Sequence, residues 1–207
     1  MAGYAASGTC GARPGGRGAA YSAVVALPFD PIRRAAALWR ARWGPDAQVP
    51  AMAAATSIMR VQQALLADFD AIVGVHGLTF ARYEVLVLLA FTRGGRLPMS
   101  TVGERLMVHP TSATNTVQRL AAAGLVERLP NPRDGRGTLA AITDRGREVM
   151  EAATSDLVDG GFGLGMLTPA EQDRLFDLLR TVRAARGDFT EPAEHTGPAD
   201  PGVAEIY

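Results

Sequence analysis

The change from a helical to a strand pattern between residues 100 and 143 constrains the fold of this 207-residue chain more than any other feature. Two short amphipathic segments, 100–107 and 110–123, are separated by the turn "MVHP". The segments "LVERL" and "TLAAIT" that follow are interpreted as strands, and the seven-residue loop "NPRDGRG" (131–137) joins them. Segments of these lengths predict a helix-turn-helix followed by a β-hairpin.

The second segment of the helix-turn-helix has an unusually polar first half. Its core side is expected to consist of Ala113, Val117 and Leu120, which recur at helical spacing. The polar candidates for contacts with DNA bases are Thr111, Ser112, Thr114, Asn115 and Gln118. In the major groove, asparagine and glutamine can form two hydrogen bonds with adenine, and a threonine methyl can pack on thymine. We expect Arg119, one turn further on, to contact a phosphate. The alternative for this helix alone is the solvated start of a helix in an ordinary bundle.

The loop 131–137 presents two arginines on a stiff, tightly turned segment. Proline, aspartate and glycine restrict its backbone, so Arg133 and Arg136 should project from a fixed place beside Asp134. The narrow minor groove of DNA concentrates negative potential and attracts inserted arginine. A plain exposed hairpin is the alternative for the loop alone. Next to a recognition helix, the three residues are predicted to belong to a wing that contacts DNA.

The distribution of charge supports this interpretation, although the chain as a whole is neutral. Residues 93–147 contain nine arginines and four acidic residues, a net charge of +5. Residues 148–207 contain four arginines and twelve acidic residues, a net charge of −8. The basic segment is the one that contains the helix-turn-helix and the hairpin, and a local basic face is what binding to phosphates requires.

Amphipathic helices flank this segment on both sides, so the fold class is expected to be mainly α. Helices are predicted at 31–43, 51–75, 79–93, 144–158 and 169–186. Asp30 is the expected cap of the first, Ser100 of the segment 100–107, and "TPAE" (168–171) is a capping box. "RGGRLPM" is predicted to be a loop and "DGGFGLGML" a flexible joint, with no strand outside the hairpin. The expected division is a disordered tail (1–23), an extension helix (24–50), a helical dimerisation region (51–78 and 144–187), a winged helix-turn-helix (79–143) and a disordered acidic tail (188–207).

Several other classes of protein are disfavoured by the sequence. A single cysteine, Cys10, excludes an internal disulfide framework. His76, His109 and His195 have no companions at metal-ligand spacing, so no metal site is expected. "GGFGLG" (160–165) imitates a dinucleotide fingerprint, but no strand precedes it, so neither a cofactor nor a catalytic residue is predicted. No apolar run is long enough to span a membrane and no secretion signal is recognised, which predicts a cytoplasmic protein that does not bind membranes.

Residues 79–147 closely resemble the MarR family of bacterial winged-helix transcription regulators. The resemblance is carried by "STVGERLMVHPTSATNTVQRLAAAGLVERLPNPRDGRGTLAAITDRG", above all by the wing tip Asp134-x-Arg136-Gly137 and by "ITDRG". It extends more loosely over residues 50–186. Many members have an acidic residue before the first wing arginine, where this chain has Asn131, and the helix at 31–43 lies outside the common fold.

The resemblance implies a homodimer whose two winged helices each bind one half of a palindromic double-stranded DNA operator. It also implies repression that a small effector relieves, bound between the dimerisation layer and the winged helices. Elimination leaves an aromatic or apolar organic effector, because no second cysteine or histidine cluster is present to sense peroxide or metal. Phe80 and Tyr83 are the candidate aromatic lining. The alternative function is a winged-helix module that contacts proteins and has no operator specificity.

Overall fold

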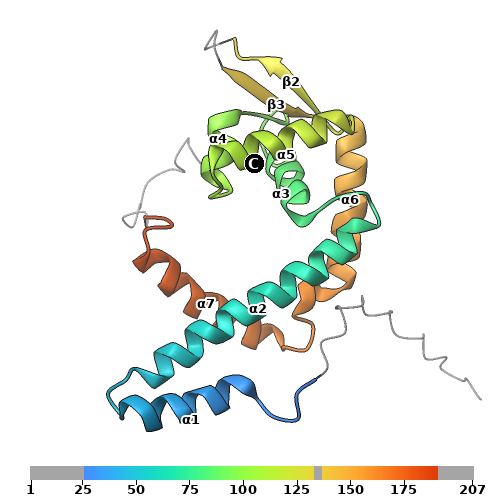
Figure 1. Cartoon of the computed structure of the whole chain (residues 1–207). Coiled ribbons are helices and arrows are strands. Elements are labelled where there is room, and N and C mark those ends of the chain that lie inside the picture. The colour runs from blue at the N-terminus through green and yellow to red at the C-terminus, as the bar shows by residue number, and fades with distance from the viewer. Residues whose placement is uncertain (1–25, 133–136, 191–207) are drawn as a thin grey trace, which may run out of the picture.

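The computed structural model describes residues 26–132 and 137–190. Its elements are, in chain order, α1 (Pro31–Trp43), α2 (Val49–Gly74), α3 (Phe80–Ala90), β1 (Arg96–Pro98), α4 (Met99–Arg105), α5 (Pro110–Ala122), β2 (Val126–Pro130), β3 (Thr138–Ile142), α6 (Asp144–Asp159), a 3-10 turn η1 (Gly161–Gly163) and α7 (Pro169–Ala185). Figure 1 shows β2, β3, α4 and α5 at one end, α1 and α7 at the other, and α2 and α6 running between the two. The predicted mainly α fold with a helix-turn-helix and a hairpin is confirmed.

The sheet has three strands rather than the expected two. Residues 96–98, predicted to be part of a loop, form β1, which pairs antiparallel with β3 and places Leu97 opposite Ala140. The strand order is β1-β3-β2, so β1 and its Pro98 occupy an edge where a missing N–H is tolerated. A three-residue strand is too short to show alternation in the sequence, and only its pairing partner defines it.

The core lies between α3, the helix-turn-helix, the sheet and α6. Leu86 and Leu89 of α3 are completely buried, which confirms the prediction that this nearly all-apolar helix is central. Ala113, Val117 and Leu120 of α5 are also buried, as their helical spacing predicts. These contacts fix α5 so that its remaining sides face outward.

The predicted cap is observed at the start of α1 and is wrong at the start of α4. Asp30 caps α1, because its Oδ1 accepts hydrogen bonds from the N–H groups of Ile32 and Arg33. Ser100 does not cap α4, contrary to the prediction: the strand β1 leads directly into this helix, so Pro98 occupies the cap position. Helix α2 begins two residues earlier than predicted and ends at Gly74, while α4 ends at Arg105.

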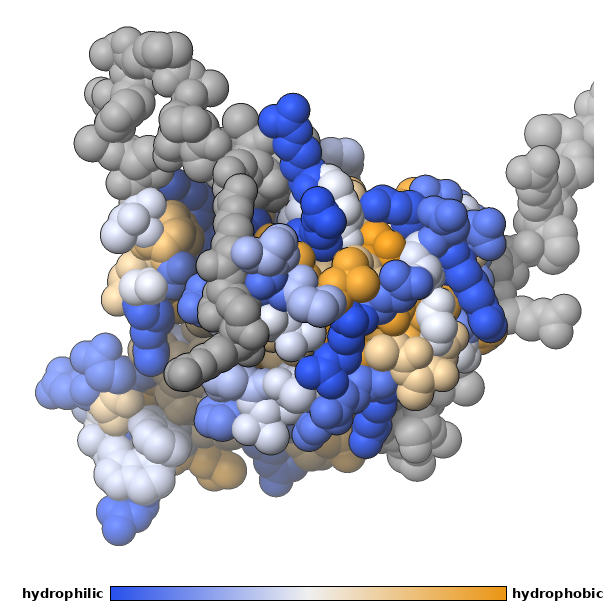
Figure 2. Space-filling model, turned by 90° about the horizontal axis from the view of Figure 1, so that it is seen from above, coloured by the Kyte–Doolittle hydropathy of each residue, from blue (hydrophilic) through white to orange (hydrophobic). Residues whose placement is uncertain are grey.

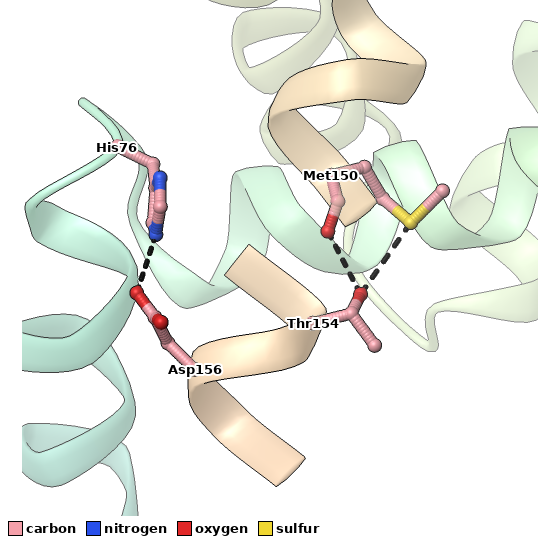
Figure 3. Close-up of polar contacts among 4 residues, drawn as sticks. All are labelled: His76, Met150, Thr154 and Asp156. Atoms are coloured by element: carbon pink, nitrogen blue, oxygen red, sulfur yellow. Dashed lines mark hydrogen bonds and ion pairs between the residues drawn. The ribbon is translucent and has the colours of Figure 1, made fainter. Parts of the chain in front are cut away.

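Helix α6 joins the winged helix-turn-helix to the far end of the molecule. Thr143 caps it by accepting a hydrogen bond from Gly146 N–H, and Gly146 itself lies against the carbonyl oxygen of Leu125. Further along, Asp156 Oδ2 lies 2.7 Å from Nε2 of His76, which follows α2 (Figure 3). This pair links α6 to the loop between α2 and α3, a role that the sequence gave no reason to expect of His76.

Thr154 forms a second link between α6 and the winged helix-turn-helix. Its hydroxyl donates to Met150 O at 2.8 Å and lies 3.5 Å from the Met150 sulfur (Figure 3). Since that proton is engaged, the 2.9 Å contact between Tyr83 and Thr154 is donated by the tyrosine hydroxyl. Helices α3 and α6 are therefore joined by a directed hydrogen bond as well as by packing.

The helices at the far end leave apolar surface uncovered in the single chain. Helix α1 lies along α2, and the indole N–H of Trp39 donates to Ala47 O, yet Trp43 is 59% exposed. Helix α7 has no buried residue at all, and Phe176 is 57% exposed. No helix among the described residues has the length and apolar character needed to cross a membrane.

Candidate nucleic-acid interface

The recognition helix α5 is positioned by the short helix before it and by its own first residues. His109 occupies the cap position, where its Nδ1 accepts a 3.3 Å hydrogen bond from Thr111 N–H, and Pro110 suits the first turn. A Cβ on Gly103 of α4 would lie 3.6 Å from Ala113 Cβ, so the two helices approach closely where the glycine leaves room. The tight packing sets the direction in which α5 points.

One side of α5 carries polar side chains that are free to bind a ligand. Since Ala113, Val117 and Leu120 face the core, a period of 3.6 residues places Thr111, Asn115 and Gln118 on the opposite side. All three side chains are exposed. Within the described residues, the Asn115 and Gln118 amides have no hydrogen-bond partner. The sequence predicted this set of outward-facing residues.

A second side of α5 faces the first turn of α3 and forms a groove with it. Its volume is about 250 Å³, and its lining is polar throughout. The lining residues are Thr79, Arg82, Ser112, Asn115, Thr116 and Arg119. Of these, Ser112, Asn115 and Arg119 were predicted DNA-contacting residues, whereas the other three were not.

The position of Arg82 depends on hydrogen bonds to the start of its own helix. Its Nε donates to Thr79 Oγ1 at 3.3 Å and one terminal nitrogen donates to Gly77 O at 3.2 Å. Among the described residues, Arg82 forms no ion pair with a carboxylate. A single arginine near the start of an apolar helix, "TFARYEV", was the available signal in the sequence.

Thr114 is less available than the sequence suggested. It is half-buried, and its hydroxyl donates to Pro110 O at 2.9 Å, one turn back along α5. Thr116 forms the same kind of bond with Ser112 O. Back-bonding of this kind engages the hydroxyl protons, so only the methyl groups and oxygen lone pairs of these threonines can meet a ligand.

The predicted wing is anchored by β2 and β3. Arg128 of β2 and Leu97 of β1 both lie opposite Ala140, and Asn131 N–H donates to Gly137 O where the loop begins and ends. Arg133, Asp134 and Arg136 lie outside the described residues, so their predicted contacts stay predictions. Figure 2 looks onto this end of the molecule and shows hydrophilic side chains over most of it, with a small hydrophobic area between them.

The candidate effector residues belong to an aromatic cluster at the junction of α2, α3 and η1. The Phe80 ring lies 4.7 Å from that of Phe69 and 5.8 Å from that of Tyr83, centroid to centroid. Phe162 of η1 adds an edge-to-face contact with Phe69 at 6.1 Å. The cluster therefore connects the winged helix-turn-helix with the helices expected to form the dimer.

The sequence model of the MarR family matches residues 76–137. The crystal structure of Sco5413, a MarR family transcriptional regulator from Streptomyces coelicolor, is 62% identical in sequence, with a TM-score of 0.65 over 69% of this chain and 99% of that one. The chain belongs to the MarR family. The predicted DNA-binding transcription regulator is confirmed at this level. MarR family regulators are non-enzymatic DNA-binding proteins, in agreement with the prediction that the chain has no catalytic residue.

Two further MarR structures from Streptomyces coelicolor are complexes, one with DNA and one with a ligand. Sco3205 in complex with DNA is 27% identical, with a TM-score of 0.59 over 68% of this chain and 90% of that one. PcaV in complex with its natural ligand is 28% identical, with a TM-score of 0.54 over 65% of this chain and 92% of that one. Among residues 26–132 and 137–190, no three or more acidic, histidine or cysteine side chains lie together in a way that could hold a metal ion.

Proposed function

We propose that this MarR protein is a homodimeric, sequence-specific regulator of transcription that binds a palindromic double-stranded DNA operator. Helix α5 enters the major groove and the loop 131–137 enters the adjacent minor groove. The observation that carries the proposal is the outward side of α5, where Asn115 and Gln118 are exposed and lack partners in the described structure. Amides held on a rigid helix above a packed core can distinguish base pairs by hydrogen bonding.

The exposed apolar surface of α2 and α7 supports the homodimer. An almost entirely apolar groove of about 530 Å³ lies between them, lined by Ile58, Phe176, Leu179, Val182 and Arg183. Contiguous exposed apolar surface is typical of protein–protein interfaces. A second copy packed on this face would cover α7. To bind both halves of a palindrome, the two recognition helices of such a dimer must lie about one DNA turn apart, roughly 34 Å.

A binding assay on the DNA upstream of the gene tests the proposal. Purified protein should protect a palindromic segment from nuclease digestion and bind it far more tightly than shuffled DNA of the same composition. Affinity should fall steeply as salt is raised, because arginine–phosphate contacts release counterions. Equal affinity for operator and shuffled DNA would instead favour the winged-helix protein-interaction module.

We further propose that the protein is a repressor and that a small aromatic or apolar compound releases it from DNA by binding beside Phe80 and Tyr83. Phe80 is half-buried, and the buried Tyr83 links α3 to α6 through Thr154, so a ligand that displaced these rings would act on both helices. Occupation of an operator by the dimer would exclude other proteins from it. Monocyclic aromatic acids should lower operator affinity in the wild type and less so in Phe80→Ala. An unaltered response in that variant would place the effector elsewhere.

A further inference from the structure

We infer that the groove between the first turn of α3 and the recognition helix binds one backbone phosphate of the operator, held between Arg82 and Arg119. The inference rests on the proposed DNA binding and adds a contact from outside the helix-turn-helix. Thr79 and Arg82, about 30 residues before α5 in the chain, line the same groove as Ser112 and Arg119, and this geometry is the premise of the inference.

The donors in the groove suit an oxyanion. Of the five N–H groups of Arg82, two bind Thr79 and Gly77, so three remain for a ligand. Arg119 forms neither a hydrogen bond nor an ion pair within the described structure, so its whole guanidinium is available. The Ser112 hydroxyl is likewise free, and Thr79 can donate its proton because its oxygen is the acceptor for Arg82.

The charge of the groove is uncompensated. Neither of its two arginines pairs with a carboxylate among the residues that the structure describes, and no acidic residue lines it. Two guanidinium groups beside one opening repel each other unless an anion lies between them. Charge-assisted hydrogen bonds from arginine to phosphate are short, strong and often bidentate, which is the arrangement that this lining offers.

The position of the groove points to the DNA backbone rather than to a base. It lies on the flank of α5, a quarter-turn or so from the side that carries Thr111 and Gln118. When that side faces the base edges, the flank faces the rim of the major groove, where the phosphates are. A water molecule occupies roughly 30 Å³. A groove of about 250 Å³ therefore holds a phosphate group with several bridging waters.

The anchoring of Arg82 explains why this residue suits the task. A free surface arginine loses side-chain entropy when it binds. Arg82 is half-buried and already held by hydrogen bonds to two residues just before α3, so less freedom is lost on contact with DNA. A phosphate bound here would fix the register of α5 in the groove while carrying no sequence information itself.

The test compares Arg82→Gln, which removes the charge, with Arg82→Lys, which keeps it. Arg82→Gln should weaken binding to operator and to shuffled DNA by similar factors, about tenfold per half-site. The slope of log affinity against log salt should become shallower by about 0.9 per half-site. Arg82→Lys should retain most of the affinity, and Arg60→Ala, on the exposed middle of α2, should bind as the wild type does.

Methylphosphonate substitution identifies the phosphate directly. A neutral methylphosphonate at one position of each half-site should weaken the wild type and have little further effect on Arg82→Gln, as expected if the two changes remove the same contact. The inference would be overturned if the methylphosphonate weakened the wild type and Arg82→Gln equally at every position. It would also be overturned if Arg82→Lys lost as much DNA affinity as Arg82→Gln does. A third outcome is that inorganic phosphate raises the melting temperature of the wild type but not of Arg82→Gln, while the two proteins respond alike to every methylphosphonate. The groove would then bind a free anion and not the DNA backbone. A wild-type protein that binds no DNA would refute the proposed function itself, whereas tight operator binding by an unaffected Arg82→Gln would refute only this contact.

Discussion

At the scale of single residues, Gly146 shows how a motif glycine enables a close approach between elements. It is the glycine of "ITDRG" and lies in the first turn of α6, where it is buried. A Cβ at this position would collide with the carbonyl oxygen of Leu125 and lie 2.9 Å from Ile142 Cγ1. The carbonyl belongs to the backbone just before β2, so it cannot move aside as a flexible side chain would.

Gly146→Ala should therefore destabilise the protein by about 3 kcal/mol, the upper part of the range for overpacking. Chemical denaturation measures the change. Gly165→Ala is the matched control, because nothing lies within 4 Å of the Cβ that it would add. Equal stability of the two variants would contradict a tight contact between Gly146 and the Leu125 carbonyl.

Asn115 and Arg136 should divide the work of DNA binding between specificity and affinity. Asn115→Ala should cost roughly 1 to 3 kcal/mol on the operator and little on unrelated DNA, as a base-edge contact would. Arg136→Ala should weaken both kinds of DNA by similar factors and flatten the salt dependence, because the minor groove attracts arginine electrostatically. Titrations against both DNAs measure this. If Arg136→Ala lost the preference for operator DNA while Asn115→Ala kept it, the two roles would be the reverse of those proposed.

At the scale of elements, the helices owe their boundaries to local caps, and α7 depends on its cap most. The carboxylate of Glu171 accepts hydrogen bonds from the N–H and the hydroxyl of Thr168, both at 2.8 Å, and the bond from the N–H is one of the two reciprocal bonds of the predicted capping box. These bonds lower the pKa of Glu171 below its ordinary value of 4.5, the backbone bond having the larger effect. A helix with no buried residue in the single chain has few other restraints.

Because the folded-state pKa is lowered, the stabilisation by the Glu171 charge is present above pH 4.5 and is lost as the pH falls through the folded value. Glu171→Ala should lower the melting temperature near neutral pH, and the difference from wild type should shrink in acid. Glu171→Gln is the matched control, since glutamine can still form the cap but does not titrate. A difference between wild type and Glu171→Ala that stays constant from pH 7 to pH 3 would contradict this role of the charge.

At the scale of the whole molecule, the helices α2 and α7 leave apolar side chains exposed that the proposed dimer would cover. Ile58 of α2 is 44% exposed and lines the same apolar groove as Phe176 of α7. The protein should be a dimer at micromolar concentration, with an interface above about 1,000 Å². Light scattering after size exclusion gives the mass. Phe176→Glu should produce monomers, whereas Arg174→Glu, which lies outside the groove lining, should not; a monodisperse wild-type monomer would refute the dimer.

The sequence by itself determined the order of the helices, the helix-turn-helix and hairpin, and most of the outward-facing residues of α5. It could do so because caps, turns and hydrophobic period are set by neighbours within a few residues. The tertiary structure alone decided that residues 96–98 form a strand, since a three-residue edge strand exists only through its pairing with β3. It also decided that Arg82 lines the same groove as Arg119 and that His76 lies beside Asp156. Those pairs join segments about 40 and 80 residues apart, and no local pattern records which distant segments the packing of a core will bring together.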